Sequence, residues 1–111
     1  MACILTKPGV EFAVIAPAGF HILWALEEIA RSGAMDVTIT SGTDGEHSGP
    51  DDPHHRGEAY DIRCHDLPDP SLFLQDLQHI LGTGQFFSFI EEPGTPNEHI
   101  HCQLRKGCTY P

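Results

Sequence analysis

The fold is decided by an alternating stretch in the middle of the chain, Glu58-Ala59-Tyr60-Asp61-Ile62-Arg63-Cys64. Side chains of an extended chain point alternately to its two sides, so Tyr60 and Ile62 share one side. Asp61 falls on the opposite side. One apolar and one polar side are typical of a strand that covers a core with one face, so we predict a strand over residues 58–64.

Two helices are predicted, one before and one after this strand. Residues 17–31 carry apolar side chains over a broad face, which predicts deep burial, and Gly33 provides a stop signal. Residues 69–81 begin with Asp69 as the N-cap and Pro70 at the first helical position. The apolar face of the first helix comprises Phe20, Ile22, Leu23, Trp24, Leu26 and Ile29.

Three further strands follow from alternation, at residues 36–40, 86–91 and 98–104. The turn-forming residues 92–96 join the last two strands into a hairpin. Residues 42–53 are polar and irregular, which predicts a long surface loop. Because helices and strands do not alternate regularly, we expect a small single α+β domain over residues 1–111, with a mostly antiparallel sheet of about four strands and two main helices.

The composition favours one compact unit. The chain has 111 residues, enough for one core, and no apolar run nears the roughly 20 residues that cross a bilayer. A net charge of -10 repels nucleic acid and anionic membranes, so we expect neither as a partner. Residues 1–10 lack a secretory signal pattern, so we expect cytoplasmic synthesis, with later release or phage-associated delivery left open. We expect a monomer.

The four cysteines show no CxxC pair and no dense disulfide pattern. Cys64 and Cys102 share the parity of the apolar strand residues, so both should face the core as buried free thiols, which we favour over a disulfide. His21 and His79 lie in the two predicted helices. We expect them to serve packing or the surface rather than chemistry.

Two short blocks carry the residue types of a metal site, His54-His55-Arg56-Gly57-Glu58-Ala59-Tyr60-Asp61 and Glu98-His99-Ile100-His101. Asp61 and His101 both point to the polar faces of their strands. If the two strands are neighbours, these side chains meet there, and either histidine at the start of the first block can join them. Two nitrogens and one carboxylate oxygen leave zinc a fourth position for water, which is the composition of a catalytic site.

The two blocks resemble the zinc D-alanyl-D-alanine carboxypeptidases and dipeptidases, whose relatives include the L-alanyl-D-glutamate endolysins and the hedgehog signalling domain. The first block matches the family pattern H-x-x-G-x-A-x-D. Its first His and final Asp are zinc ligands there, which implies His54 and Asp61 here and makes His55 a neighbour. The second block matches an acidic residue, His, any residue, His, and implies His101 as the third ligand. The resemblance implies a hedgehog/DD-peptidase-like fold.

The resemblance also implies catalytic roles for the second block. Glu98 would be the general base that deprotonates the zinc-activated water. His99 would be a hydrogen-bonding group beside the oxyanion that forms during the reaction.

One position departs from the family pattern. The family commonly has Ser-Gly-x-Arg at the end of the strand before the first block, and its arginine grips the substrate carboxylate or holds the transition state. Here Ser41-Gly42 matches, but Asp44 stands at the arginine position and would repel a carboxylate. Arg63, on the face of Asp61, and Arg56 are the candidate replacements, together with Ser41 for substrate binding. An ion pair with a nearby carboxylate is the alternative role for Arg63.

The function we expect is zinc-dependent hydrolysis of a peptide bond in peptidoglycan stem peptides or related short peptides. The alternative is a non-catalytic zinc domain, in which His47 or His55 would fill the fourth coordination position. Calcium binding by Asp44, Glu46, Asp51 and Asp52 is not favoured, because this loop lacks the ordered spacing of an EF-hand.

Overall fold

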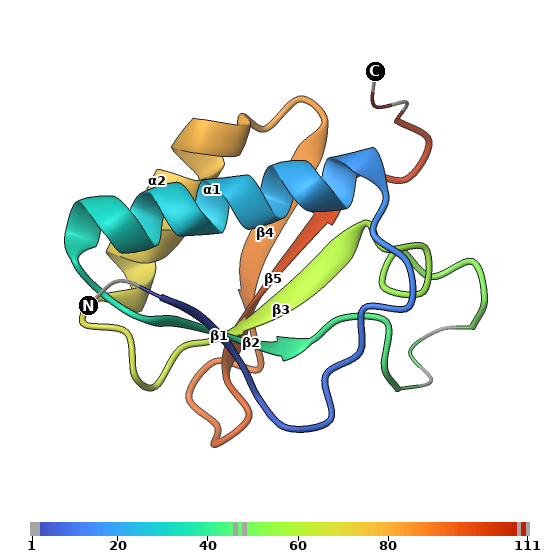
Figure 1. The fold of residues 1–111 in the computed structure, drawn as a ribbon. Coiled ribbons are helices and arrows are strands. Elements are labelled where there is room, and N and C mark those ends of the chain that lie inside the picture. The colour runs from blue at the N-terminus through green and yellow to red at the C-terminus, as the bar shows by residue number, and fades with distance from the viewer. Residues whose placement is uncertain (1–2, 46, 48, 109, 111) are drawn as a thin grey trace.

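The computed structural model describes residues 3–45, 47, 49–108 and 110, which form two helices and five strands (Figure 1). The elements follow one another as β1 (Ile4–Thr6), α1 (Pro17–Gly33), β2 (Val37–Ser41), β3 (Ala59–Arg63), α2 (Pro70–Leu81), β4 (Phe86–Glu91) and β5 (His99–Leu104). Both helices lie on one side of the sheet. In the described part of the chain the other face carries no helix.

The strands form one mixed sheet in the order β1-β2-β3-β5-β4. β1 runs parallel to β2, and every other neighbouring pair is antiparallel. The expected α+β class with a mostly antiparallel sheet and a hairpin of the last two strands is therefore confirmed. The sheet has five strands rather than the expected four, because β1 was not predicted. This strand has three residues, too few for an alternating pattern to show.

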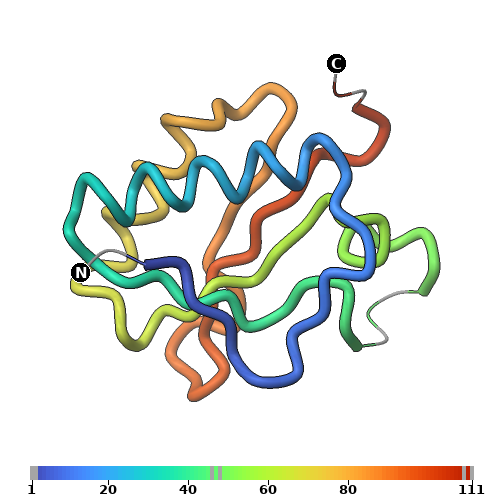
Figure 2. The backbone as a smooth tube through the Cα atoms, viewed as in Figure 1, coloured from blue at the N-terminus to red at the C-terminus, as the bar shows by residue number. Residues whose placement is uncertain are grey.

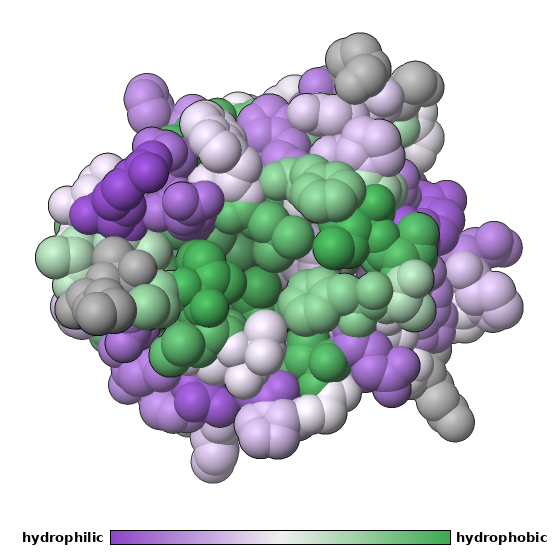
Figure 3. All heavy atoms as spheres, in the orientation of Figure 1, coloured by the Kyte–Doolittle hydropathy of each residue, from purple (hydrophilic) through white to green (hydrophobic). Residues whose placement is uncertain are grey.

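The apolar face of α1 is wider than the area that the sheet and α2 cover. Ile22, Leu26 and Ile29 are buried, but Phe20 and Trp24 are 60% and 49% exposed. The expected deep burial of the whole stripe is therefore wrong. Phe20 and Trp24 are spaced four residues apart, on a line of the helix that is rotated away from the core. These two rings border a hollow of about 720 Å³ lined by α1, β1 and the segment between them, and Figure 3 shows apolar surface across this face.

The second helix follows the sequence prediction closely. It starts at the predicted proline, and the Asp69 side chain accepts a hydrogen bond from the Leu72 N–H at 3.1 Å. The helix ends before Gly82. The first helix instead continues past its predicted end through Gly33, and Ala34 takes the left-handed cap position with φ of 50°.

The core lies between the helices and the sheet, and β3 and β5 supply its centre. Tyr60, Ile62, Ile100 and Cys102 are each 0% exposed. Cys64 is also fully buried, and both cysteines are free thiols, as predicted. Burial raises the pKa of the Cys64 thiol to about 11 and that of Cys102 to about 12. Both side chains therefore stay protonated at neutral pH and act as small apolar residues.

Gly57 joins the turn before β3 to the start of α1. Its carbonyl oxygen accepts a hydrogen bond from the Ala16 N–H at 3.2 Å, and its own N–H donates to the His54 carbonyl oxygen at 3.1 Å. Figure 2 shows these two segments side by side. Gly57 has φ of +71°, and a Cβ atom there would lie 2.3 Å from the Val14 carbonyl oxygen. Both conditions require glycine, so Gly57 fixes the turn that carries His54.

The Gly57→Ala variant is therefore expected to be much less stable than its matched control, Gly82→Ala. Gly82 has a similar φ of +74°, but a Cβ atom there meets nothing within 4 Å. The control should lose only the backbone penalty, about 1–3 kcal/mol for alanine at a φ of 74° and a ψ of 168°. Gly57→Ala adds a clash with backbone, so we expect a total loss of about 3 kcal/mol or more in urea unfolding. Equal losses in the two variants would contradict the close approach to Val14.

Candidate metal centre

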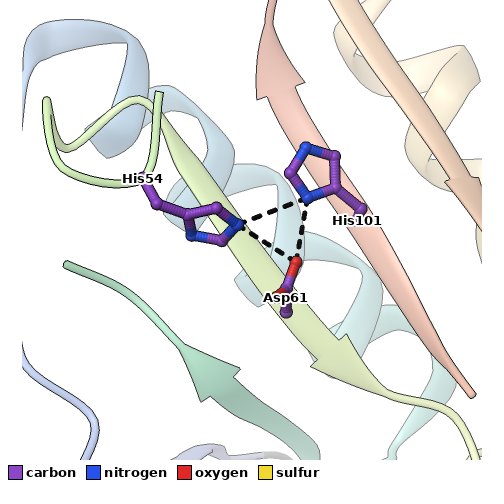
Figure 4. A group of neighbouring side chains, drawn as sticks. All are labelled: His54, Asp61 and His101. Carbon is purple, nitrogen blue, oxygen red and sulfur yellow. Dashed lines mark hydrogen bonds and ion pairs between the residues drawn. The ribbon is translucent and has the colours of Figure 1, made fainter. Parts of the chain in front are cut away.

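Three side chains converge on the sheet face opposite the helices (Figure 4). Asp61 in β3 is paired with His101 in β5 by the strand register, so the two side chains point to the same face. The expectation that these strands are neighbours is confirmed. His54 reaches the pair from the turn before β3, and its ring nitrogen points toward the Asp61 carboxylate.

The three nearest atoms have the spacing of ligands around a tetrahedral ion. His54 Nε2 lies 3.3 Å from Asp61 Oδ1 and 3.3 Å from His101 Nδ1. His101 Nδ1 lies 2.9 Å from Asp61 Oδ1. Bonds of about 2.0–2.1 Å at tetrahedral angles keep ligand atoms about 3.3 Å apart. The three side chains are thus close enough to bind a metal ion.

Both histidines have a hydrogen-bond acceptor at the nitrogen that faces away from the group. His54 Nδ1 donates to the Gly42 carbonyl oxygen at 3.0 Å. His101 Nε2 donates to Gln103 Oε1 at 2.8 Å. The Gln103 amide nitrogen itself donates to the Leu104 carbonyl oxygen, which orients its oxygen toward His101. With a ring proton on each outer nitrogen, the inner nitrogens would be free to donate electron pairs to a metal ion, the arrangement typical of metal-binding histidines.

The group is largely withdrawn from solvent. The His54 side chain is 4% exposed, and those of Asp61 and His101 are 13% exposed. Burial raises the pKa of Asp61, but hydrogen bonds from His101 and His54 outweigh it and hold the pKa well below its usual range. Burial lowers the pKa of His101, but its bonds to Asp61 and Gln103 outweigh it, so the pKa lies above its ordinary value. A buried carboxylate thus stays charged between two imidazoles, which suits a cation.

The donor set of two imidazole nitrogens and one carboxylate oxygen fits zinc, and the two other nearby histidines do not complete it. Both ring nitrogens of His55 contact carbonyl oxygens, at 2.6 and 2.7 Å. His47 stacks on His54 with ring centroids 4.0 Å apart, and its Nε2 lies 2.7 Å from the Asp44 carbonyl oxygen. Among the described residues neither belongs to a group of converging ligand atoms. Glu46, part of the calcium interpretation, lies outside the described residues.

The three residues predicted to take part in catalysis line one small hollow beside this group. Glu98, His99 and Arg63 border a space of about 130 Å³, which Lys7 and Thr40 also line. The strand register places Arg63 opposite His99, two positions from the Asp61–His101 pair.

Glu98 does not point directly at the metal group. Its Oε1 accepts a hydrogen bond from the Gly94 N–H at 2.8 Å in the β4–β5 turn. Among the described residues, neither of the two groups of potential metal ligands contains Glu98. The predicted base therefore lies at the edge of the site, and its role stays a prediction.

The other predicted substrate contacts have partners within the protein. The Arg56 guanidinium pairs with Glu58 at 2.9 Å, and Arg63 lies 3.8 Å from Asp66. Ser41 Oγ lies 3.3 Å from His47 Nε2. Asp44, at the position of the family arginine, accepts hydrogen bonds from the N–H groups of Gly42 and Glu11 and so holds the loop after β2 against the segment before α1.

Three residues near the site were not anticipated from the sequence. Glu91 pairs with His99 in the register of β4 and β5, and its Oε1 lies 2.8 Å from His99 Nε2. The hairpin prediction could have found Glu91 if the register had been worked out. Gln103 could have been found two positions after His101 on the same strand face. For Lys7 the sequence offers no signal, because β1 was not recognised.

Comparisons of the chain with protein-family models, with curated proteins and with solved structures find no match. Within the described residues, neither helix combines the length and the apolar character that a membrane crossing requires.

The Gln103→Leu variant tests the outer support of His101. Leucine cannot accept the His101 Nε2–H, so the ring loses its fixed tautomer and orientation. We expect zinc affinity to fall about 10–100-fold, measured by competition with a chelator. The exposed Gln75→Leu variant on α2 is the matched control and should bind zinc as the parent does. Unchanged affinity in Gln103→Leu would show that His101 does not depend on this contact.

Proposed function

We propose that this protein is a zinc-dependent peptidase that hydrolyses peptide bonds in peptidoglycan stem peptides or related short peptides. The observation that supports this most is the convergence of His54, Asp61 and His101 with no fourth protein ligand among the described residues. A set of three protein ligands with a free position is typical of catalytic rather than structural zinc. The match to the two family blocks is the second support.

Two features beside the metal group could contact a bound peptide. On one side along β5 lies the hollow lined by Arg63 and Lys7, two cations that could bind a substrate carboxylate. On the neighbouring strand β4, Phe89 is opposite His101 with its ring 5.4 Å away, and Phe87 lies 5.0 Å from Phe89. This aromatic row offers apolar contact to a peptide chain that crosses the metal group.

Bound zinc would supply a water of lowered pKa and polarise the substrate carbonyl group. In the proposed reaction Glu98 would take a proton from the attacking water, whose oxygen would bond to the carbonyl carbon. The C–N bond then breaks, and the proton passes from Glu98 to the leaving amine. His99 donates a hydrogen bond to the oxyanion. Glu98 Oε1 accepts the Gly94 N–H, which would leave Oε2 to take the proton.

A non-catalytic zinc domain is the second candidate, and the placement of Glu98 favours it. Glu98 Oε1 accepts a hydrogen bond from the Gly94 N–H of its own turn, and among the described residues Glu98 belongs to neither group of converging ligand atoms. Asp44 in place of the family arginine points the same way. In this alternative the zinc would serve stability or recognition of a partner.

Two variants separate these functions. The zinc-loaded protein is incubated with purified muropeptides, and the products are identified by mass spectrometry. We expect new amino termini with the parent, full zinc content but turnover reduced at least about 100-fold in Glu98→Gln, and loss of zinc in His101→Ala. Glu92→Gln, in the same turn, is the control and should stay active.

Full activity of Glu98→Gln would rule out Glu98 as the base. A parent that binds zinc but cleaves no stem peptide or short peptide would favour the non-catalytic domain.

A further inference from the structure

A second group of potential metal ligands shares Asp61 with the first. Ligand atoms of His99, Glu91 and Asp61 all lie within 4.8 Å of one another. His99 Nε2 is 2.8 Å from Glu91 Oε1 and 3.7 Å from Asp61 Oδ2. The first group uses the other oxygen, Asp61 Oδ1. The two oxygens of one carboxylate therefore face different histidines.

The strand registers produce this arrangement directly. Asp61 is opposite His101, and His99 is opposite Glu91, on three adjacent strands. His99 and His101 are two positions apart on β5, so they share a face. The potential ligands of the second group thus come from strands that the core already holds in place.

His99 has the same outer support as the two histidines of the first group. Its Nδ1 donates to the Asn97 carbonyl oxygen at 2.7 Å, which leaves Nε2 facing the two carboxylates. All three histidines around Asp61 thus have an oxygen acceptor on the outer nitrogen and direct the inner nitrogen toward a carboxylate. An ordinary surface ion pair does not need this repeated arrangement, whereas metal-binding histidines show it regularly.

We propose that this face binds two divalent transition-metal ions bridged by Asp61, the second on His99 Nε2, Glu91 Oε1 and Asp61 Oδ2. One imidazole nitrogen and two carboxylate oxygens are ligands that zinc accepts. Bridged ions about 3.5–4 Å apart are a recurring arrangement in hydrolases, including aminopeptidases. The catalytic meaning of this inference rests on the proposed function, but the number of bound ions does not.

The second ion should bind more weakly than the first. The Glu91 side chain is 45% exposed, whereas His54 in the first group is 4% exposed. Solvent competes with the carboxylate of Glu91 for the ion. In a protein loaded with both ions, His99 is a ligand and no longer a hydrogen-bond donor to the oxyanion.

The experiment is a titration of the metal-free protein with zinc by calorimetry, with the bound metal counted after dialysis. The parent is expected to bind two equivalents in two steps. Glu91→Gln and His99→Asn should lose the weaker step and keep the tighter one, which also reports that they are folded. Asp61→Asn should weaken both. The controls Glu27→Gln and His79→Asn, exposed residues on the two helices, should bind as the parent does.

Cobalt provides a readout of the bridge itself. In protein loaded with two Co²⁺ ions, magnetic coupling through Asp61 should reduce the electron paramagnetic resonance signal per ion, and Glu91→Gln should restore the uncoupled signal of a single ion.

A parent that binds only one equivalent of zinc would overturn the second site and leave the first site and the proposed peptidase standing. Two equivalents that both persist in Glu91→Gln and His99→Asn would also overturn it. If the parent showed no tight binding of zinc at all, the proposed function would lose its basis.

Discussion

The antiparallel pairing of β3 with β5 is the interaction on which both the fold and the candidate site depend. On its inner side Tyr60, Ile62 and Ile100 are fully buried in the core. Because side chains alternate, the same register brings Asp61 and His101 together on the outer side. A slip of one residue would turn the Asp61 carboxylate into the core, which costs several kcal/mol for an unpaired charge. Core packing therefore enforces the geometry of the metal group.

This division between the two faces also selects the chemistry. The thiols of Cys64 and Cys102 lie on the core side with raised pKa values, while imidazoles and carboxylates line the outer side. A metal ion on the outer face would therefore meet nitrogen and oxygen donors, and it could not reach the sulfur atoms of these two cysteines. His54 is the one ligand that does not come from a strand, and its turn is held by Gly57 against the start of α1.

Much of this arrangement could be predicted from alternation, capping and turn residues alone. Asp69 and Pro70 located α2, and the parity of Asp61 and His101 placed them on the polar face. Other features could not be predicted. The three residues of β1 are too short for a pattern, and the exposure of Phe20 depends on how far the sheet extends under α1. The proximity of Glu91 to His99 needs the register of the hairpin, and the contact of Glu98 with Gly94 depends on the conformation of a turn.

The most direct test of the central claim is X-ray absorption at the zinc edge of protein loaded with one equivalent of zinc. We expect nitrogen and oxygen neighbours at about 2.0–2.1 Å, with the multiple scattering of two imidazole rings and a coordination number of four. In His101→Ala that imidazole scattering should drop or the zinc should be lost. A sulfur shell at about 2.3 Å, or an ion with no imidazole neighbours, would contradict the assignment of His54, Asp61 and His101 as ligands.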